Sequence, residues 1–303
     1  DARNLNRDAP TRLCYLGTVL HALNDPLEKS RSPLQVGAEL YGHAGIDSDL
    51  EIVQLMLEAL AIAGLLNVHL DLGHVAIFRG LSKLAGLDPE QESRVFEIMQ
   101  RKAMPELNEL LLSFRIQDPV RSMLVQLPGL NGVQGVLEKA AEILSESSRD
   151  VLDAIEYLKE FSRRLRVLFP LLPIHFDLSE LRGYHYQTGV VFAAFVPGYG
   201  REIARGGRYD EIGKVFGRAR PATGFSADVK VLASLARKAR NRTTDRVFAP
   251  ADPDLDLDEK IRDLRGSGHV VIRELFGQEG GSAEMQCAYR LERQHREWLV
   301  VAL

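Results

Sequence analysis

The chain has 303 residues, of which 45% are hydrophobic and 26% are charged. This is ordinary globular composition, and the length allows one large domain or a large and a small one. The formal net charge of -4 lacks the basic signature of a nucleic-acid binder, and no apolar run approaches the roughly 18 residues of a membrane span. Two distant cysteines, Cys14 and Cys287, exclude a disulfide framework and a structural zinc site. We therefore expect a reducing, cytoplasmic compartment and no bound metal.

The chain opens at Asp1 without an initiator Met or a signal-like segment, so we expect upstream sequence to be missing. Residues 12–20 are strand-like, residues 24–33 have loop chemistry, and residues 34–41 predict a second strand. Together they indicate an antiparallel hairpin with a long loop. Caps at Asp47, Ser48 and Asp49 then predict a helix over about 49–64.

Helical periodicity dominates residues 81–167, after a short buried strand at 67–71 and the start of a helix at 73–79. The pattern predicts a helical insertion between two β-rich stretches. Its clearest helical segments are 90–99, 104–114, 135–144 and 149–168.

Strands return after this insertion, and a strand-to-helix stretch covers residues 222–238. The predicted strands are 174–178, 182–196 and 201–207, with Gly198 and Gly200 in a hairpin turn. Residues 240–256 are polar and predict a linker, although a strand is also expected at 246–249. The tail then predicts a helix at 257–266, a strand at 269–273 and two further β stretches. The whole pattern indicates an α+β fold with domains at 1–239 and 240–303.

Three short stretches carry polar side chains in patterns that suit a binding site. In the first, Gln35, Gly37 and Glu39 alternate with apolar residues and therefore share one face of a strand. A carboxylate there can hold an ammonium group, and glycine lets a ligand approach the backbone. The alternative is that this face is simply solvated.

The second stretch, residues 181–189, combines a cation, aromatic rings, an imidazole and amides, which suit a planar polar ligand. On its own, His185 is more often structural. In the third stretch, Arg205 and Arg208 flank a Gly-Gly pair, which indicates either close approach of a ligand or a tight turn with solvated arginines. The basic loop that follows either faces a phosphate or acidic partner or is solvated, and its cations are Lys214, Arg218 and Arg220.

The order and spacing of these stretches resemble the class II histidyl-tRNA synthetases over about residues 1–238. Residues 12–21 and the run Gln35-Val-Gly-Ala-Glu39 resemble the motif 2 hairpin, and residues 181–189 resemble the histidine-specific segment. Residues 205–210 resemble the next strand, and residues 223–228 resemble motif 3. The resemblance implies a class II synthetase-like antiparallel sheet with flanking helices, a helical insertion at about 81–167 and a small C-terminal α/β domain. It places the motif 1 region upstream of Asp1.

Two departures remove the groups that bind ATP in these synthetases. Motif 2 of that family carries an arginine and a glutamate where this chain has Leu20-His21-Ala22-Leu23, and motif 3 carries a second arginine where this chain has Val231. Charge-assisted contacts to phosphate contribute kilocalories to transition-state stabilisation. Formation of an aminoacyl-adenylate should therefore be lost, while the histidine pocket is retained.

This combination resembles the regulatory subunits of short-form ATP phosphoribosyltransferase, which are non-catalytic paralogues of the synthetases. Those subunits associate with a small catalytic subunit at the first step of histidine biosynthesis, activate it and confer feedback inhibition by L-histidine. The resemblance implies no catalytic residue, no cofactor, no tRNA and no membrane, and a dimer within a hetero-oligomer. The residues that it implies in histidine binding are Gln35, Glu39, Arg182, Tyr184, His185, Tyr186, Gln187 and Tyr209.

Within this set, Glu39 is expected to bind the α-ammonium group with help from Gln35, and Arg182 to face the carboxylate. The imidazole would be lined by Tyr186, Gln187 and Tyr209. The synthetases carry Asp-Tyr-Tyr where this chain has His185-Tyr186-Gln187, which implies rearranged contacts to the imidazole.

Two other classes stay open at this stage. A divergent synthetase would catalyse ATP–pyrophosphate exchange, which the absent arginines argue against. A tRNA-binding or sensor module would show salt-sensitive binding of tRNA, which the net charge of -4 argues against.

Overall fold

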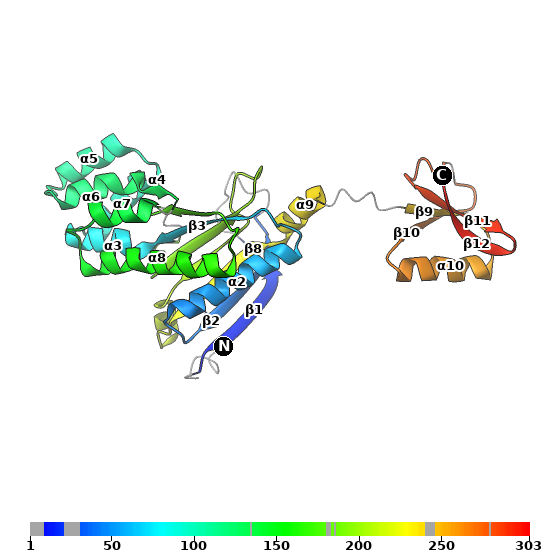
Figure 1. Ribbon diagram of the computed structural model, residues 1–303, viewed down its shortest axis with the longest axis horizontal. Coiled ribbons are helices and arrows are strands. Elements are labelled where there is room, and N and C mark those ends of the chain that lie inside the picture. Colours follow the sequence, from blue (N-terminus) through cyan, green and yellow to red (C-terminus); the bar gives the residue numbers. More distant parts are fainter. Residues whose placement is uncertain are drawn as a thin grey trace. The chain divides into compact units, whose positions relative to one another are not determined.

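The computed structural model describes residues 9–20, 31–133, 135–179, 183–184, 186–239, 246–278 and 280–303. The chain divides into two compact units, residues 1–239 and residues 240–303. Each unit has a sheet and a hydrophobic core of its own (Figure 1). Among the described residues, no helix combines the length and the apolar character needed to cross a membrane.

The first unit is built on an eight-stranded sheet with the order β1-β2-β8-β7-β6-β3-β5-β4. Neighbouring strands in this sheet are antiparallel, except that β3 and β5 run parallel to each other. The strands are β1 (Thr11–Thr18), β2 (Leu34–Tyr41), β3 (His69–His74), β4 (Asn131–Gly132), β5 (Ile174–Asp177), β6 (Val190–Phe195), β7 (Ala204–Arg208) and β8 (Ala222–Asp228). The pairing of β1 with β2 confirms the predicted hairpin.

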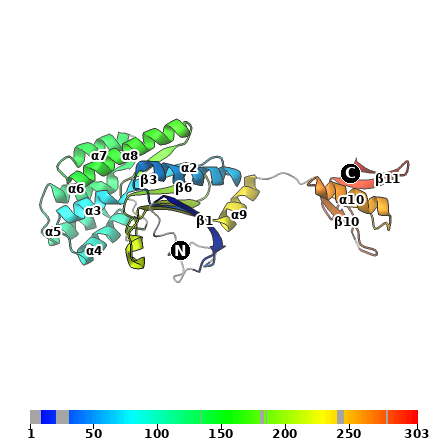
Figure 2. The same cartoon turned by 90° about the horizontal axis from the view of Figure 1, so that it is seen from below.

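Helices α2 (Ile46–Ile62) and α8 (Arg149–Leu168) cover one face of this sheet (Figure 2). Helix α9 (Val229–Ala239) packs against β2 and β8. The core lies between sheet and helices, where Leu40 of β2 and Met56 of α2 are almost fully buried. Because side chains alternate along a strand, the residues next to Leu40 point to the opposite face.

The predicted helical insertion is present between β3 and β5, and it packs through α3 and α7 against α8. Its helices are α3 (Val75–Leu84), α4 (Pro89–Gln100), α5 (Met104–Ser113), α6 (Val120–Gln126), the 3-10 turn η1 (Leu127–Gly129) and α7 (Gly135–Ile143). Asp88 and Gln91 form a reciprocal capping box at the start of α4. The sequence did not predict α6, because two turns are too short to display helical periodicity.

The structure corrects the predicted strand over 182–196, since β6 begins only at Val190. Gly183 has a φ of 75°, in the left-handed region that strands exclude. Its carbonyl oxygen accepts hydrogen bonds from the backbone N–H groups of Tyr186 and Gln187 at 2.8 and 2.9 Å. This local turn replaces the ladder hydrogen bonds of a strand.

The predicted capping of the first helix is also wrong. Helix α2 begins at Ile46 after Gly45, and no side chain caps it. Asp49 lies inside the helix and is fully buried, where it forms an ion pair with an arginine of β7. The acidic residues of the first turn therefore do not all serve the helix N-terminus.

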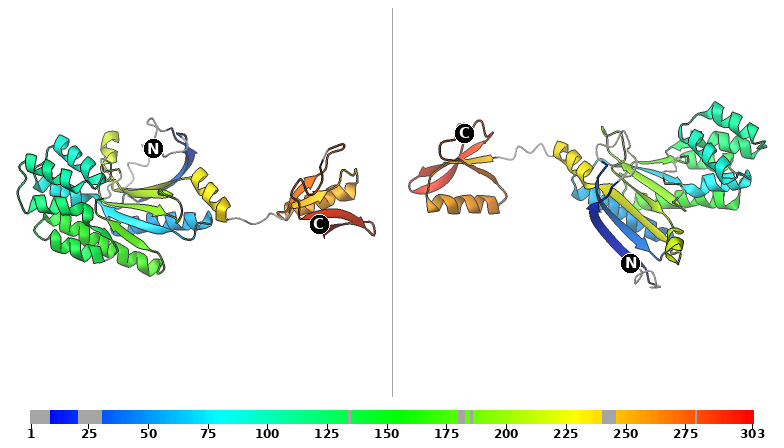
Figure 3. Two further views of the ribbon diagram at one scale, coloured as in Figure 1. Left: turned by 90° about the horizontal axis from the view of Figure 1, so that it is seen from above. Right: turned by 180° about the vertical axis from the view of Figure 1, so that it is seen from behind.

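The second unit is a four-stranded sheet with the order β10-β9-β11-β12, with one helix packed along it (Figure 3). Its elements are β9 (Arg246–Ala249), α10 (Leu255–Gly266), β10 (Val270–Arg273), β11 (Tyr289–Gln294) and β12 (Glu297–Ala302). Residues 246–256 thus belong to this unit and not to a linker, and β9 confirms the strand expected at 246–249. The indole N–H of Trp298 donates to Asp254 at 2.9 Å and fixes β12 to the start of the helix.

Candidate ligand-binding site

A cavity of about 370 Å³ lies on the face of the large sheet opposite to α2 and α8. Strand register explains why this face is hollow. Glu39 pairs with Gly224, Gly224 with Gly207, Gly207 with Val191, and Val191 with Gly73, so that one row across five strands contains three glycines. Because these three glycines carry no side chain, they leave room above the backbone for neighbouring side chains of the pocket and for a ligand.

Two of these glycines are required by their neighbours. A Cβ atom on Gly224 would lie 1.6 Å from Oε2 of Glu39, and one on Gly207 would lie 2.6 Å from Oε1 of Gln187. The Gly-Gly pair lies within β7 and not in a tight turn. Gly207 makes space for the side chain of Gln187 in the pocket.

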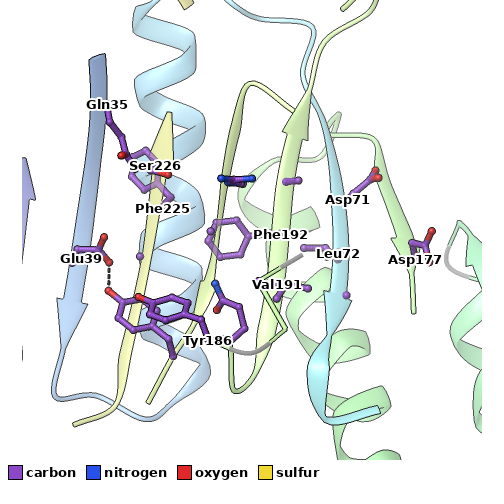
Figure 4. A pocket seen from close by; sticks show the side chains of 18 of the residues that line it. Gln35, Glu39, Asp71, Leu72, Asp177, Tyr186, Val191, Phe192, Phe225 and Ser226 are labelled. Carbon is purple, nitrogen blue, oxygen red and sulfur yellow. Dashed lines mark hydrogen bonds between the residues drawn. The ribbon is translucent and has the colours of Figure 1, made fainter. Parts of the chain in front are cut away.

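Tyrosines surround the carboxylate of Glu39. The hydroxyl of Tyr209 donates a hydrogen bond to Oε2 of Glu39. The ring of Tyr186 stacks on that of Tyr209, with centroids 4.6 Å apart. The ring of Tyr41 meets the Tyr209 ring edge-on, with centroids 6.4 Å apart. Figure 4 shows Glu39 and Tyr186 at the same side of the pocket.

Burial raises the pKa of Glu39 to about 7, although the hydrogen bond from Tyr209 acts in the opposite direction. Within the described ranges, Glu39 forms no ion pair. A partly buried carboxylate without a cation favours a ligand that brings a protonated nitrogen, because the new charge would restore the ionised form.

Gln35 and Tyr15 extend the same side of the cavity. The side-chain amide of Gln35 donates to the hydroxyl of Tyr15 at 3.2 Å. The Tyr15 ring lies over Gly37, where a Cβ atom would come within 2.5 Å of the ring. Sequence reasoning missed Tyr15, since the residues on either side of it in β1 are apolar or small and show no polar alternation.

Gln187 is buried and lines the cavity, and its Oε1 atom has no hydrogen-bond partner among the residues that the structure describes. A buried carbonyl without a donor costs free energy that a ligand N–H group would recover. Tyr184 lies elsewhere, contrary to expectation. Its ring packs between Phe78 and Phe96, and its hydroxyl donates to Glu92 at 2.5 Å. The two remaining expected residues, Arg182 and His185, lie outside the described residues.

The opposite side of the cavity is acidic and was not predicted (Figure 4). Asp71 lies 3.5 Å from Nδ1 of His175. Burial would raise the pKa of Asp177, but hydrogen bonds from Lys102 and Ser179 lower it further than burial raises it. The signal in the sequence was weak, since each of these two short strands contributes a single acidic residue.

The basic cluster predicted after β7 does not form one surface. Lys214 pairs with Glu211, its neighbour one turn away. Arg220 is buried and donates to the carbonyl oxygen of Ala9 at 3.0 Å. Neither these two nor Arg218 lines the cavity.

Val231, which stands where the synthetases have an arginine, is partly buried and packs against the core of the first unit. The segment that would carry the other arginine, residues 21–30, lies outside the described part of the chain. Among the residues that the structure describes, no group of three or more His, Cys, Asp or Glu side chains is arranged to hold a metal ion.

The fold and sequence place the first unit among histidyl-tRNA synthetase-like proteins. The family model for histidyl-tRNA synthetase matches residues 1–232. A regulatory subunit/histidyl-tRNA synthetase structure from Bacillus halodurans aligns with a TM-score of 0.74 and 25% identity, over 92% of this chain and 72% of that one. These matches confirm the predicted class II synthetase-like fold.

The relatives narrow this class. A model for the C-terminal domain of the ATP phosphoribosyltransferase subunit HisZ matches residues 244–301. The ATP phosphoribosyltransferase regulatory subunit of Methylococcus capsulatus is 55% identical over 99% of this chain and 74% of its own length. That of Thioalkalivibrio sulfidiphilus is 49% identical over 100% of this chain and 77% of its own length. The chain belongs to the family of ATP phosphoribosyltransferase regulatory subunits, which confirms the predicted assignment as a regulatory subunit.

Proposed function

We propose that this regulatory subunit binds a separate ATP phosphoribosyltransferase catalytic subunit, activates it, and binds L-histidine in the cavity as the signal for feedback inhibition. One observation supports the ligand most directly. Glu39 is a partly buried carboxylate with tyrosine neighbours and, among the described residues, no ion-pair partner, and it lies in a cavity whose size suits a small molecule. A free amino acid with a protonated nitrogen fits both the charge and the volume.

In this proposal, Glu39 holds the α-ammonium group and Gln35 assists it. The imidazole lies against Tyr186 and Tyr209, with a ring N–H donated to the unpartnered oxygen of Gln187. The tyrosines around Glu39 also suit the reverse orientation, in which a protonated imidazole meets the carboxylate. Arg182 is proposed to face the ligand carboxylate.

Calorimetry with three ligands tests this site. Histidine should bind, and imidazole propionate should bind much more weakly if Glu39 holds the α-ammonium group. Histidinol, which lacks the carboxylate, tests the role of Arg182. In Glu39→Gln, histidine affinity should fall by about 2–3 kcal/mol, or roughly 30- to 150-fold, because one partner of a buried charge pair is removed. Unchanged affinity in this variant would refute the assignment.

The regulatory role is tested by the rate of phosphoribosyl transfer from PRPP to ATP. The full-length protein should raise the rate of a short-form catalytic subunit, and histidine should lower it again. Histidine must then bind the inactive complex better than the active one, and substrates must weaken histidine binding by the same factor. A rate that stays constant on addition of this protein would reject the proposal, and ATP–pyrophosphate exchange would then test a divergent synthetase.

The proposal includes a dimer within the hetero-oligomer and a cytoplasmic location. Both cysteines are unpaired, as suits a reducing compartment. Sedimentation of the full-length protein, alone and with the catalytic subunit, measures the assembly.

A further inference from the structure

Arg208, the last residue of β7, is a buried cation with two carboxylate partners. Its Nε and Nη2 atoms lie 3.0 Å from Oδ2 of Asp49 on α2. Its Nη1 atom donates to Oδ1 of Asp210 at 3.1 Å. The side chains of Arg208 and Asp49 are 7% and 0% exposed, so solvent screens this ion pair very little.

The remaining guanidinium donors hold the loop between β2 and α2. Nη2 of Arg208 donates to the hydroxyl of Ser48 at 2.8 Å and to the carbonyl oxygen of Gly45 at 3.2 Å. Nη1 donates to the carbonyl oxygen of His43 at 3.2 Å. Because β2 also carries Glu39, these bonds fix the end of the strand that supplies the carboxylate of the pocket.

Tyr209 follows Arg208 and points to the other face of the sheet, where its hydroxyl reaches Glu39. The backbone around it is fixed to β8. The N–H group of Tyr209 donates to the carbonyl oxygen of Ala222 at 2.8 Å, and Oδ1 of Asp210 accepts the N–H group of Ala222 at 3.0 Å. The Arg208 ion pair and the Tyr209 contact are thus two sides of one short segment.

Helix α8 joins this group through Tyr157. The hydroxyl of Tyr157 donates to Oδ2 of Asp49, the oxygen that also receives Arg208. The Tyr157 ring meets the ring of His74 edge-on at 5.4 Å. In the described part of the chain, the other oxygen of Asp49 has no hydrogen-bond partner, so both of these hydrogen bonds are accepted by Oδ2.

We infer that Arg208 is a positioning residue of the ligand pocket: it holds Tyr209 against Glu39 from the opposite face of the sheet, and Tyr157 links that arrangement to α8. A buried ion pair adds little net stability, because desolvation offsets the attraction. Its contribution here is geometry, since a planar guanidinium satisfies all of these partners in one orientation only. An ammonium group has too few donors to do the same.

The test compares Arg208→Lys and Tyr157→Phe with the wild type, in the full chain without ligand. The first readout is the titration of the Glu39 carboxyl by 13C NMR, assigned through Glu39→Gln. If Tyr209 moves away from Glu39, the carboxylate loses a hydrogen bond that stabilises its charge, and the midpoint should rise by about half a pH unit or more. A residue that only stabilised the fold would not move this midpoint.

Tyr184→Phe is the matched control, because Tyr184 is also a buried tyrosine whose hydroxyl donates to a carboxylate, but it lies outside the cavity. It should leave the Glu39 midpoint unchanged. Tyr157→Phe keeps the ring, so it preserves the test if Arg208→Lys does not fold.

Histidine affinity is the second readout and rests on the proposed function, with a loss of about tenfold expected in both variants. If Glu39 titrates as in the wild type in a folded Arg208→Lys or Tyr157→Phe protein, the inference is wrong. If the wild type does not bind histidine, the proposed function fails instead, and the titration still decides the role of Arg208.

Discussion

At the scale of single residues, the buried carboxylate of Glu39 lowers the stability of the ligand-free protein and is proposed to bind the cationic ligand. Burial raises its pKa from the model-compound value of 4.5 to about 7. As the pH rises from about 4.5 to 7, the unfolded chain loses this proton before the native protein does, so the free energy of unfolding falls across that window. Above pH 7 the full cost remains, until a cationic ligand offsets it.

Glu39→Gln should therefore stabilise the ligand-free first unit at pH 8, by about 1–2 kcal/mol after allowance for solvent screening. The amide carries no charge to desolvate and still accepts the hydrogen bond from Tyr209. At pH 5, where the native carboxyl is mostly protonated, less than half of this gain should remain. Denaturant titration at the two pH values measures the difference. An equal gain at both would show that the charge of Glu39 is not the cause.

Some residues that line the pocket could be predicted from the sequence, and others could not. Alternation along one strand predicted that Gln35 and Glu39 share a face, and both line the cavity. Tyr15 and Asp177 could not be predicted, because their presence in the cavity depends on which strands are neighbours. Tyr184 was assigned to the pocket by the resemblance, whereas its ring packs against Phe78 and Phe96 of the helical insertion.

At the scale of elements, periodicity predicted the long helices and strands. It failed where a local turn with its own hydrogen bonds interrupts an apparently regular pattern. Helices α4 and α8 repeat an apolar face over several turns, so their positions follow from the sequence. The segment 183–189 has strand-like residues, but the left-handed Gly183 and the hydrogen bonds to its carbonyl oxygen turn it before β6 begins.

The glycine row across the sheet predicts the effect of Gly207→Ala. The new methyl group would lie 2.6 Å from both Oε1 of Gln187 and the backbone oxygen of Val190. We expect a loss of about 1–3 kcal/mol in stability and at least a tenfold loss in histidine affinity. Gly200→Ala, with nothing within 4 Å, is the control and should change neither. Normal histidine binding by Gly207→Ala would remove Gln187 from the ligand site.

The capping box of α4 supports a second prediction at this scale. Asp88 accepts the N–H groups of Glu90 and Gln91 at 2.9 Å, so Asp88→Ala leaves both donors without this partner. The free energy of unfolding should fall by about 1 kcal/mol in chemical denaturation. Glu97→Ala, an exposed change in the same helix, should stay within about 0.5 kcal/mol of the wild type. Equal effects of the two variants would contradict a capping role.

At the scale of the molecule, the cavity collects residues from positions 15 to 226 of the chain. These residues are far apart in the sequence. The strand order of the sheet brings them together, because β8 and β7 lie between β2 and β6. The second unit has a smaller separate core around Leu257 and Trp298. Its α/β character was predictable because its strands and its helix are punctuated by Asp, Pro and Gly.

The separate cores predict that histidine stabilises the first unit selectively. Trp298 is the sole tryptophan of the chain and is buried in the second unit, so its fluorescence follows that unit. Most helices belong to the first unit, so far-ultraviolet circular dichroism follows mainly that one. Histidine at a hundred times its Kd should raise the free energy of unfolding of the first unit by about 2.7 kcal/mol, because the ligand binds only the folded state. The dichroism transition should move to higher denaturant while the Trp298 transition stays in place. At the same histidine concentration, Glu39→Gln should reduce the stabilisation to less than about 1 kcal/mol, because its affinity is expected to be roughly 30- to 150-fold lower. A Trp298 transition that moved by the same amount would mean that the two units unfold as one.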